Sequence, residues 1–134
     1  MFDWKEYLAL AEEMLGTGQP AAATSEARLR CAVSRAYYAA FGRASGYLRE
    51  LHGLDDLPEK ADIHKEVVRR FKGDNDKGWR VIGKDLDELR EYRNDADYHA
   101  DVGGWASTAD LSLRKAARSV AALTRLPGAP PSWF

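Results

Sequence analysis

The chain has 134 residues and a mass of 15.0 kDa, which suits one domain with its own core and leaves no room for a second. Its 20 Lys and Arg against 21 Asp and Glu give a net charge of −1, so bulk charge gives no sign of a nucleic-acid-binding protein. The first residues lack the pattern of a signal peptide, and no segment has the ~20 apolar residues of a membrane span. With one cysteine, Cys31, the chain forms no internal disulfide, and we expect a cytoplasmic protein.

Glycine, proline and polar clusters divide the chain into five predicted helices, and no segment has the pattern of a strand. The helices span about residues 3–15, 25–51, 61–71, 77–102 and 107–125. We expect Gly103 and Gly104 to end the fourth helix. Ser107 and Asp110 have the form of a capping box that starts the fifth. The sequence therefore predicts an all-α fold in one domain of residues 1–126, followed by a Pro-rich C-terminal tail of residues 127–134.

The apolar faces of these helices predict the core. Apolar residues of the second helix recur on one face at about 100° per residue, and the fourth helix carries a similar stripe. The residues expected in or near the core are Leu29, Val33, Tyr37, Phe41, Leu48, Ile82, Leu86, Leu89, Leu111 and Val120.

The opposite face of the second helix combines arginines with small residues. Arg28, Arg35 and Arg49 recur at multiples of seven residues, and Gly42 and Gly46 are among the small residues between them. Two glycines inside a helix cost about 1 kcal/mol each relative to alanine, so we expect something to pack closely on this face. The alternatives are a helix contact within the chain, which we favour, and a subunit interface or phosphate cleft.

Charge is segregated along the chain. Residues 27–49 hold five arginines and no acid, residues 111–125 hold four basic residues and no acid, and residues 84–101 are net acidic. We favour charge complementarity between helices over a phosphate-binding surface as the explanation.

Arg93 occupies a position that helix periodicity reserves for an apolar residue. It continues the spacing of Leu86 and Leu89, and Ala96 follows on the same stripe. Six residues later comes His99, a side chain of the type that most readily gives and takes protons near neutral pH. A cation and a proton carrier are what in-line cleavage of a phosphodiester needs.

One ideal helix does not bring Arg93 and His99 together, because they are about 120° apart around it and about 9 Å apart along it. Two copies of the helix that meet about a twofold axis would form one shared groove. Asp95 is spaced to orient His99, and Asp97 to pair with Arg93. The alternative is that Arg93 belongs to a structural ion pair and that His99 caps a helix end or lies on the surface.

Other chemistries lack support in the sequence. His52, His64 and His99 do not have the spacing of zinc ligands, so we expect no metal site and read His64 as structural. The chain has no Gly-rich phosphate loop and no serine in a nucleophile elbow. We expect no cofactor.

Three segments together resemble a known family: residues 34–41, 63–71 and 90–99. In this order they are similar to the HEPN domain (higher eukaryotes and prokaryotes nucleotide-binding), over about residues 25–125. The resemblance implies an up-and-down helical bundle that is usually dimeric and often encoded beside a minimal nucleotidyltransferase, in toxin–antitoxin or defence systems. Many HEPN proteins are metal-independent ribonucleases.

The same resemblance implies roles for single residues. Arg93 would hold the scissile phosphate, Asn94 would position Arg93 or the RNA, and His99 would act as acid or base. The family signature is an arginine and a histidine separated by four to six residues, and here five residues intervene. The local arginines expected to form a positively charged groove are Arg35, Arg90 and Arg43.

We therefore expect a homodimeric endoribonuclease that acts on RNA, as the toxin or effector of such a system with a minimal nucleotidyltransferase as antitoxin. The alternative is a non-catalytic nucleotide-binding or adaptor subunit that works with the nucleotidyltransferase. A plain helical interaction module is a third hypothesis.

Overall fold

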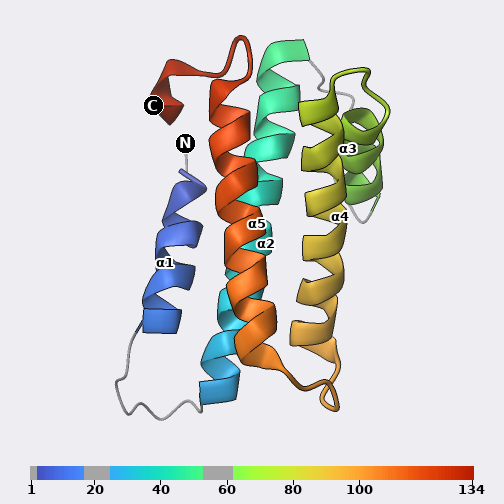
Figure 1. Ribbon diagram of the computed structural model, residues 1–134. Coiled ribbons are helices and arrows are strands. Elements are labelled where there is room, and N and C mark those ends of the chain that lie inside the picture. Colours follow the sequence, from blue (N-terminus) through green and yellow to red (C-terminus); the bar gives the residue numbers. More distant parts are fainter. Residues whose placement is uncertain (1–2, 17–24, 53–61) are drawn as a thin grey trace.

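The computed structural model describes residues 3–16, 25–52 and 62–134. Within these residues the chain forms five α-helices and one short 3-10 helix, and no strand (Figure 1). They are α1 (Lys5–Gly16), α2 (Ser25–His52), α3 (Ile63–Lys72), α4 (Lys77–Tyr98), α5 (Trp105–Arg125) and the 3-10 helix η1 (Pro131–Trp133). The prediction of an all-helical bundle is confirmed.

Helix α2 is the centre of the bundle, because it contacts all four other α-helices. The long helices α2, α4 and α5 run alternately up and down beside one another (Figure 1). Helix α1 packs against α2 and α5, whereas α3 packs mainly against α4 on the far side of the bundle. No helix in the described ranges is long and apolar enough to cross a membrane.

The core lies where α2, α4 and α5 meet. Most of the residues predicted for it are buried, namely Val33, Tyr37, Leu48, Ile82, Leu86, Leu89 and Val120. Leu29 and Phe41 are partly buried and pack against the core. Leu111 was predicted wrongly: it is 41% exposed.

The start of α5 explains the error at Leu111. The helix begins at Trp105, after Gly104 in the left-handed conformation (φ 74°), so the predicted capping box of Ser107 and Asp110 is wrong. Trp105 is buried, and its Nε1 donates a 2.8 Å hydrogen bond to the carbonyl of Val102. Leu111 lies about 120° around the helix from Trp105, so it faces outward while Trp105 is buried.

Helix α4 begins at Lys77, as predicted. The Asp76 carboxylate caps it by accepting a 3.1 Å hydrogen bond from the backbone N–H of Trp79. Helix α3 spans Ile63–Lys72. The predicted start of this helix at Ala61 lies outside the described residues.

The small residues of α2 receive aromatic side chains from both ends of the chain. A side chain at Gly42 would collide with the Trp4 ring, and one at Gly46 would come 3.7 Å from the Trp133 ring. A contact within the chain, the alternative we favoured, therefore explains Gly42, whereas 3.7 Å is an ordinary contact distance and leaves room for a side-chain carbon at Gly46.

The segment predicted as a tail, residues 127–134, packs against α2. The Tyr47 hydroxyl donates a 2.9 Å hydrogen bond to the carbonyl of Pro127. The carbonyl of Trp133 accepts from Arg43 Nη2 at 3.0 Å and from Lys5 Nζ at 2.6 Å. Because Lys5 begins α1 and Trp133 ends η1, these bonds bring the two ends of the described chain together (Figure 1).

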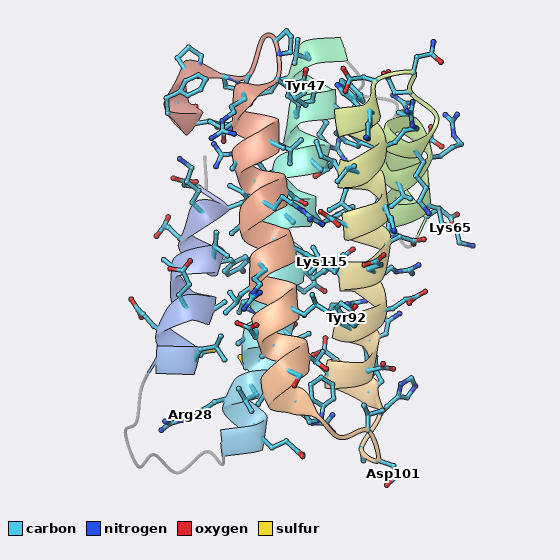
Figure 2. All side chains as sticks on the ribbon, in the orientation of Figure 1. Arg28, Tyr47, Lys65, Tyr92, Asp101 and Lys115 are labelled. Carbon is cyan, nitrogen blue, oxygen red and sulfur yellow. The ribbon has the colours of Figure 1, made fainter. Side chains whose placement is uncertain are left out.

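Ion pairs join α4 to α5. Asp85 is 2% exposed and accepts hydrogen bonds of 2.9 and 2.6 Å from the two nitrogens Nε and Nη2 of Arg118. Lys115 reaches from α5 towards α4 (Figure 2) and pairs with Glu88 at 2.5 Å. We favoured charge complementarity between helices as the explanation of the segregated charges. These ion pairs show such complementarity between α4 and α5.

Candidate functional site

Arg93 lies on the inward stripe of α4, with its side chain 15% exposed. Its Nη1 donates to the Tyr38 hydroxyl at 2.8 Å, and its Nη2 donates to Asn94 Oδ1 at 2.8 Å. The guanidinium also lies over the rings of Tyr37 and Tyr38, at 5.2 and 5.5 Å from their centroids. Aromatic faces and hydrogen-bond acceptors thus make a cation tolerable at an apolar position. Asn94 therefore accepts a hydrogen bond from Arg93, its neighbour in sequence.

Asp97 provides a carboxylate beside Arg93. Its Oδ2 is 3.9 Å from Arg93 Nη1 and accepts a 3.4 Å hydrogen bond from Ser34 Oγ. Ser34 Oγ in turn accepts a 3.3 Å hydrogen bond from Arg35 Nη2. The contact expected between Asp97 and Arg93 is therefore present, as a loose ion pair that links α4 to α2.

Arg35 lies close to Arg93, because both contact the Tyr38 ring. The Arg35 guanidinium is 4.9 Å from the ring centroid of Tyr7 and 5.2 Å from that of Tyr38. The Nε atoms of Arg35 and Arg93 are both buried, and neither has a hydrogen-bond partner among the residues that the structure describes. The structure thus brings together two arginines at one tyrosine ring.

His99 lies just beyond α4, which ends at Tyr98 and not at the predicted Gly103. As the C-cap residue it has an extended backbone (φ −116°, ψ 102°), and its N–H donates to the carbonyl of Asp95 at 3.1 Å. Its ring is 59% exposed, and Nδ1 is 2.7 Å from Asp95 Oδ1. A carboxylate only accepts hydrogen bonds, so Nδ1 carries the proton and Nε2 of the neutral ring is free to accept one. Asp95 orients His99 as its spacing predicted.

Arg30 binds the backbone at the end of α4, although no sequence pattern indicated that it belongs to the site. Its Nη1 donates to the carbonyls of Asp95 and Ala96 at 3.3 and 3.0 Å, and its Nη2 donates to the carbonyl of Ala100 at 3.2 Å. Its guanidinium also lies 4.5 Å from the ring centroid of Trp105. A cation at a helix C-terminus satisfies carbonyls that have no partner within the helix. Arg30 therefore fixes the backbone on both sides of His99.

A shallow pocket of about 270 Å³ opens beside His99. It is lined by Glu26, Arg30, Asp97, Tyr98, His99 and Ala100. No hydrogen bond or ion pair joins His99 to Arg93 within the described chain. Asp97 connects the two, because it lines this pocket and also lies beside Arg93.

Of the other two arginines predicted for the groove, Arg90 lies one turn before Arg93 on α4, and Arg43 is buried on α2. Arg90 is partly exposed, and its charge acts on buried Tyr37 and His64. Arg43 is 1% exposed and stacks on Trp133, with its guanidinium 4.1 Å from the ring centroid. Burial lowers the pKa of Arg43 from its ordinary value. Because Arg43 is buried against Trp133, its guanidinium does not line a groove at the surface.

The buried side chain of His64 contacts Tyr37, one of the two tyrosines under the Arg93 guanidinium. The Tyr37 hydroxyl and His64 Nδ1 are 3.0 Å apart, and His64 Nε2 is 3.5 Å from Asp87 Oδ1. Burial lowers the pKa of His64 to about 4 and raises the pKa of Tyr37 to about 12. Both side chains are therefore neutral near pH 7, and Tyr37 presents its ring to Arg93.

Among residues 3–16, 25–52 and 62–134, no group of three or more His, Cys, Asp and Glu side chains is arranged to hold a metal ion. Comparison of the chain with protein-family models, with curated proteins and with solved structures found no match. The fold and the site define a helical bundle in which a constrained arginine and an oriented, exposed histidine lie near the end of one helix.

Proposed function

We propose that the protein is a metal-independent endoribonuclease of the HEPN class, the toxin or effector of a toxin–antitoxin or defence system. One observation supports it above the others: α4 carries Arg93, constrained by Tyr38 and Asn94, and at its end an exposed histidine that Asp95 orients. A cation and a proton carrier of defined orientation are the two groups that this chemistry requires.

The reaction is attack of a ribose 2′-hydroxyl on the adjacent phosphate, with loss of the 5′-oxygen. Arg93 and Arg35 stabilise the negative charge on the phosphoryl oxygens through their own positive charges, which lie at the same Tyr38 ring. His99 accepts a proton through Nε2 from the 2′-hydroxyl, or, when charged, gives one to the leaving oxygen.

The proposal includes a homodimer with α4 near the twofold axis. In the described part of one chain no hydrogen bond or ion pair joins His99 to Arg93, whereas a second copy can place its own His99 opposite Arg93. A minimal nucleotidyltransferase is the proposed antitoxin partner.

A non-catalytic adaptor subunit for a nucleotidyltransferase is the second candidate, and one observation favours it. Arg93 already donates to Tyr38 and Asn94 and has Asp97 within 3.9 Å, so its contacts also suit a purely structural role. The two candidates differ in what they require of His99, which cleavage needs and an adaptor does not.

The test is cleavage of a varied RNA pool by the purified protein in the presence of EDTA. We expect products with 2′,3′-cyclic phosphate ends. His99→Ala and Arg93→Ala should each lower the rate by a factor of ~100 or more. Asp101→Ala is the control, because Asp101 is exposed in the connection between α4 and α5 (Figure 2) and should leave the rate unchanged.

Two outcomes would contradict the proposal. Failure of the wild-type protein to cut RNA while it binds nucleotides or a transferase would favour the adaptor. Equal cleavage by wild type and His99→Ala would point to a contaminating nuclease.

A further inference from the structure

The pocket beside His99 offers a ligand mainly hydrogen-bond acceptors. Glu26 Oε2 accepts one hydrogen bond from Arg30 Nε at 3.3 Å, and Asp97 Oδ2 accepts one from Ser34. Each carboxylate oxygen has two lone pairs, so both oxygens of either carboxylate can still accept from a ligand. Three of the donor contacts of Arg30 go to backbone carbonyls, which leaves the arginine little to offer a ligand. Two carboxylates repel a phosphate, so this pocket suits a neutral ligand that carries N–H donors.

An exposed aromatic ring borders the same pocket. Tyr98 is 72% exposed, although it is the last residue of α4 and adjoins His99. A large aromatic side chain left at the surface beside a polar pocket provides a flat face on which a nucleic-acid base can stack. Stacking on aromatic side chains contributes to binding whatever the base, so the polar groups determine which base is preferred.

The size of the pocket limits its ligand. Pockets that enclose drug-sized molecules measure about 300–1,000 Å³, and this one measures about 270 Å³. It is therefore suited to a single base, with the attached phosphate outside it. Two cations, Arg93 and Arg35, lie next to Asp97, one directly and the other through Ser34.

We infer that this pocket binds a guanine base, stacked on Tyr98 and paired through its Watson–Crick edge with the Glu26 carboxylate. Guanine presents two neighbouring donors on that edge, N1–H and the N2 amino group, which match the two oxygens of one carboxylate. Adenine and cytosine present one amino group beside an acceptor, and uracil presents one N–H between two acceptors that a carboxylate repels. The inference rests on the proposed function, because it gives the ribonuclease a preference for RNA with guanine at the cleavage site.

Binding and cleavage are measured separately, so that the inference and the proposed function can fail independently. In binding, the probes are GMP, AMP, CMP and UMP, followed by NMR shifts of the Tyr98 and His99 side chains. We expect GMP to bind roughly tenfold more tightly than the other three nucleotides. Glu26→Gln should remove this preference, and Tyr98→Leu should weaken the binding of all four. Glu50→Gln, a change of another exposed α2 glutamate, is the matched control and should leave both unchanged.

In cleavage, the ends of fragments from a random RNA pool are sequenced. Guanine beside the cut in wild type, and no base preference in Glu26→Gln, would support the inference. If GMP binding depends on Glu26 but no RNA is cleaved, the guanine pocket is supported and the proposed ribonuclease activity is refuted. Equal binding of the four nucleotides, or the same preference in wild type and Glu26→Gln, would overturn the guanine pocket whether or not RNA is cut. Circular dichroism spectra matching wild type confirm that each variant is folded.

Discussion

Arg93 Nη1 donates a 2.8 Å hydrogen bond to the Tyr38 hydroxyl, which joins α4 to α2 where Arg93 interrupts the apolar stripe. The same Tyr38 ring lies beneath Arg35. One tyrosine thus positions both arginines of the candidate site, through its hydroxyl for Arg93 and through its ring face for both. The stability of the bundle and the geometry of the site depend on the same side chain.

Tyr38→Phe should lower the free energy of unfolding by about 1–2 kcal/mol, because it keeps the ring and removes the acceptor of a charged donor. Urea denaturation gives this value. Tyr98→Phe removes a hydroxyl from a ring that is 72% exposed and should change stability by less than about 0.5 kcal/mol. An equal effect of the two changes would mean that the hydrogen bond to Arg93 contributes nothing.

Asp85→Ala should destabilise the protein by about 2–3 kcal/mol. Removing one partner of a buried ion pair usually costs more, but the Arg118 side chain is 58% exposed and regains contact with water. Asp110→Ala breaks a pair with Arg114 in which both side chains are exposed, and should cost less than about 0.5 kcal/mol. Thermal unfolding of both variants measures the difference, and similar melting temperatures would refute the importance of Asp85.

The position of Arg93 in the helix could be predicted from the sequence alone. Its place on the inward stripe follows from the spacing of Leu86, Leu89 and Ala96, which local helix geometry determines. The contact between Asp95 and His99 was also predictable, since residues four apart lie together on a helix.

The end of α4 shows where local patterns stop being sufficient. The helix ends at Tyr98, where Arg30, 65 to 70 residues earlier, binds the carbonyls on both sides of His99. Likewise, α5 begins at the buried Trp105 and not at the predicted capping box of Ser107 and Asp110. Such contacts between distant segments leave no periodic signal, so Arg30 and the pocket beside it were not predictable.

The C-terminal segment supports another prediction. Trp133→Ala should destabilise the protein by about 1–3 kcal/mol, because it removes the ring that stacks on buried Arg43 and packs against the core. Phe134→Ala changes a neighbouring side chain that is 78% exposed and should have little effect. Urea denaturation of the two variants provides the measurement, and an unchanged midpoint for Trp133→Ala would mean that residues 127–134 behave as a free tail.

The last prediction concerns pH and the buried ring of His64. Its pKa in the folded protein is about 4, against about 6.5 in an unfolded chain, because burial and the charges of Arg90 and Arg93 outweigh the attraction of Asp87. Between these two values the unfolded chain binds more protons than the folded one, so stability falls as the pH decreases from about 6.5 to 4. The difference corresponds to about 3 kcal/mol, all of it lost below pH 4.

Urea denaturation at several pH values between 4.5 and 6.5 tests this, since most carboxylates remain ionised in that range. His64→Gln keeps a polar group that can accept from the Tyr37 hydroxyl but does not titrate, so its stability should vary little over the range. His99→Gln changes an exposed ring and should keep the wild-type decrease. A wild-type stability that stays constant from pH 6.5 to 4.5 would show that His64 is not held neutral by its burial beside Tyr37. The same slope in His64→Gln as in wild type would show that another group is responsible for the decrease.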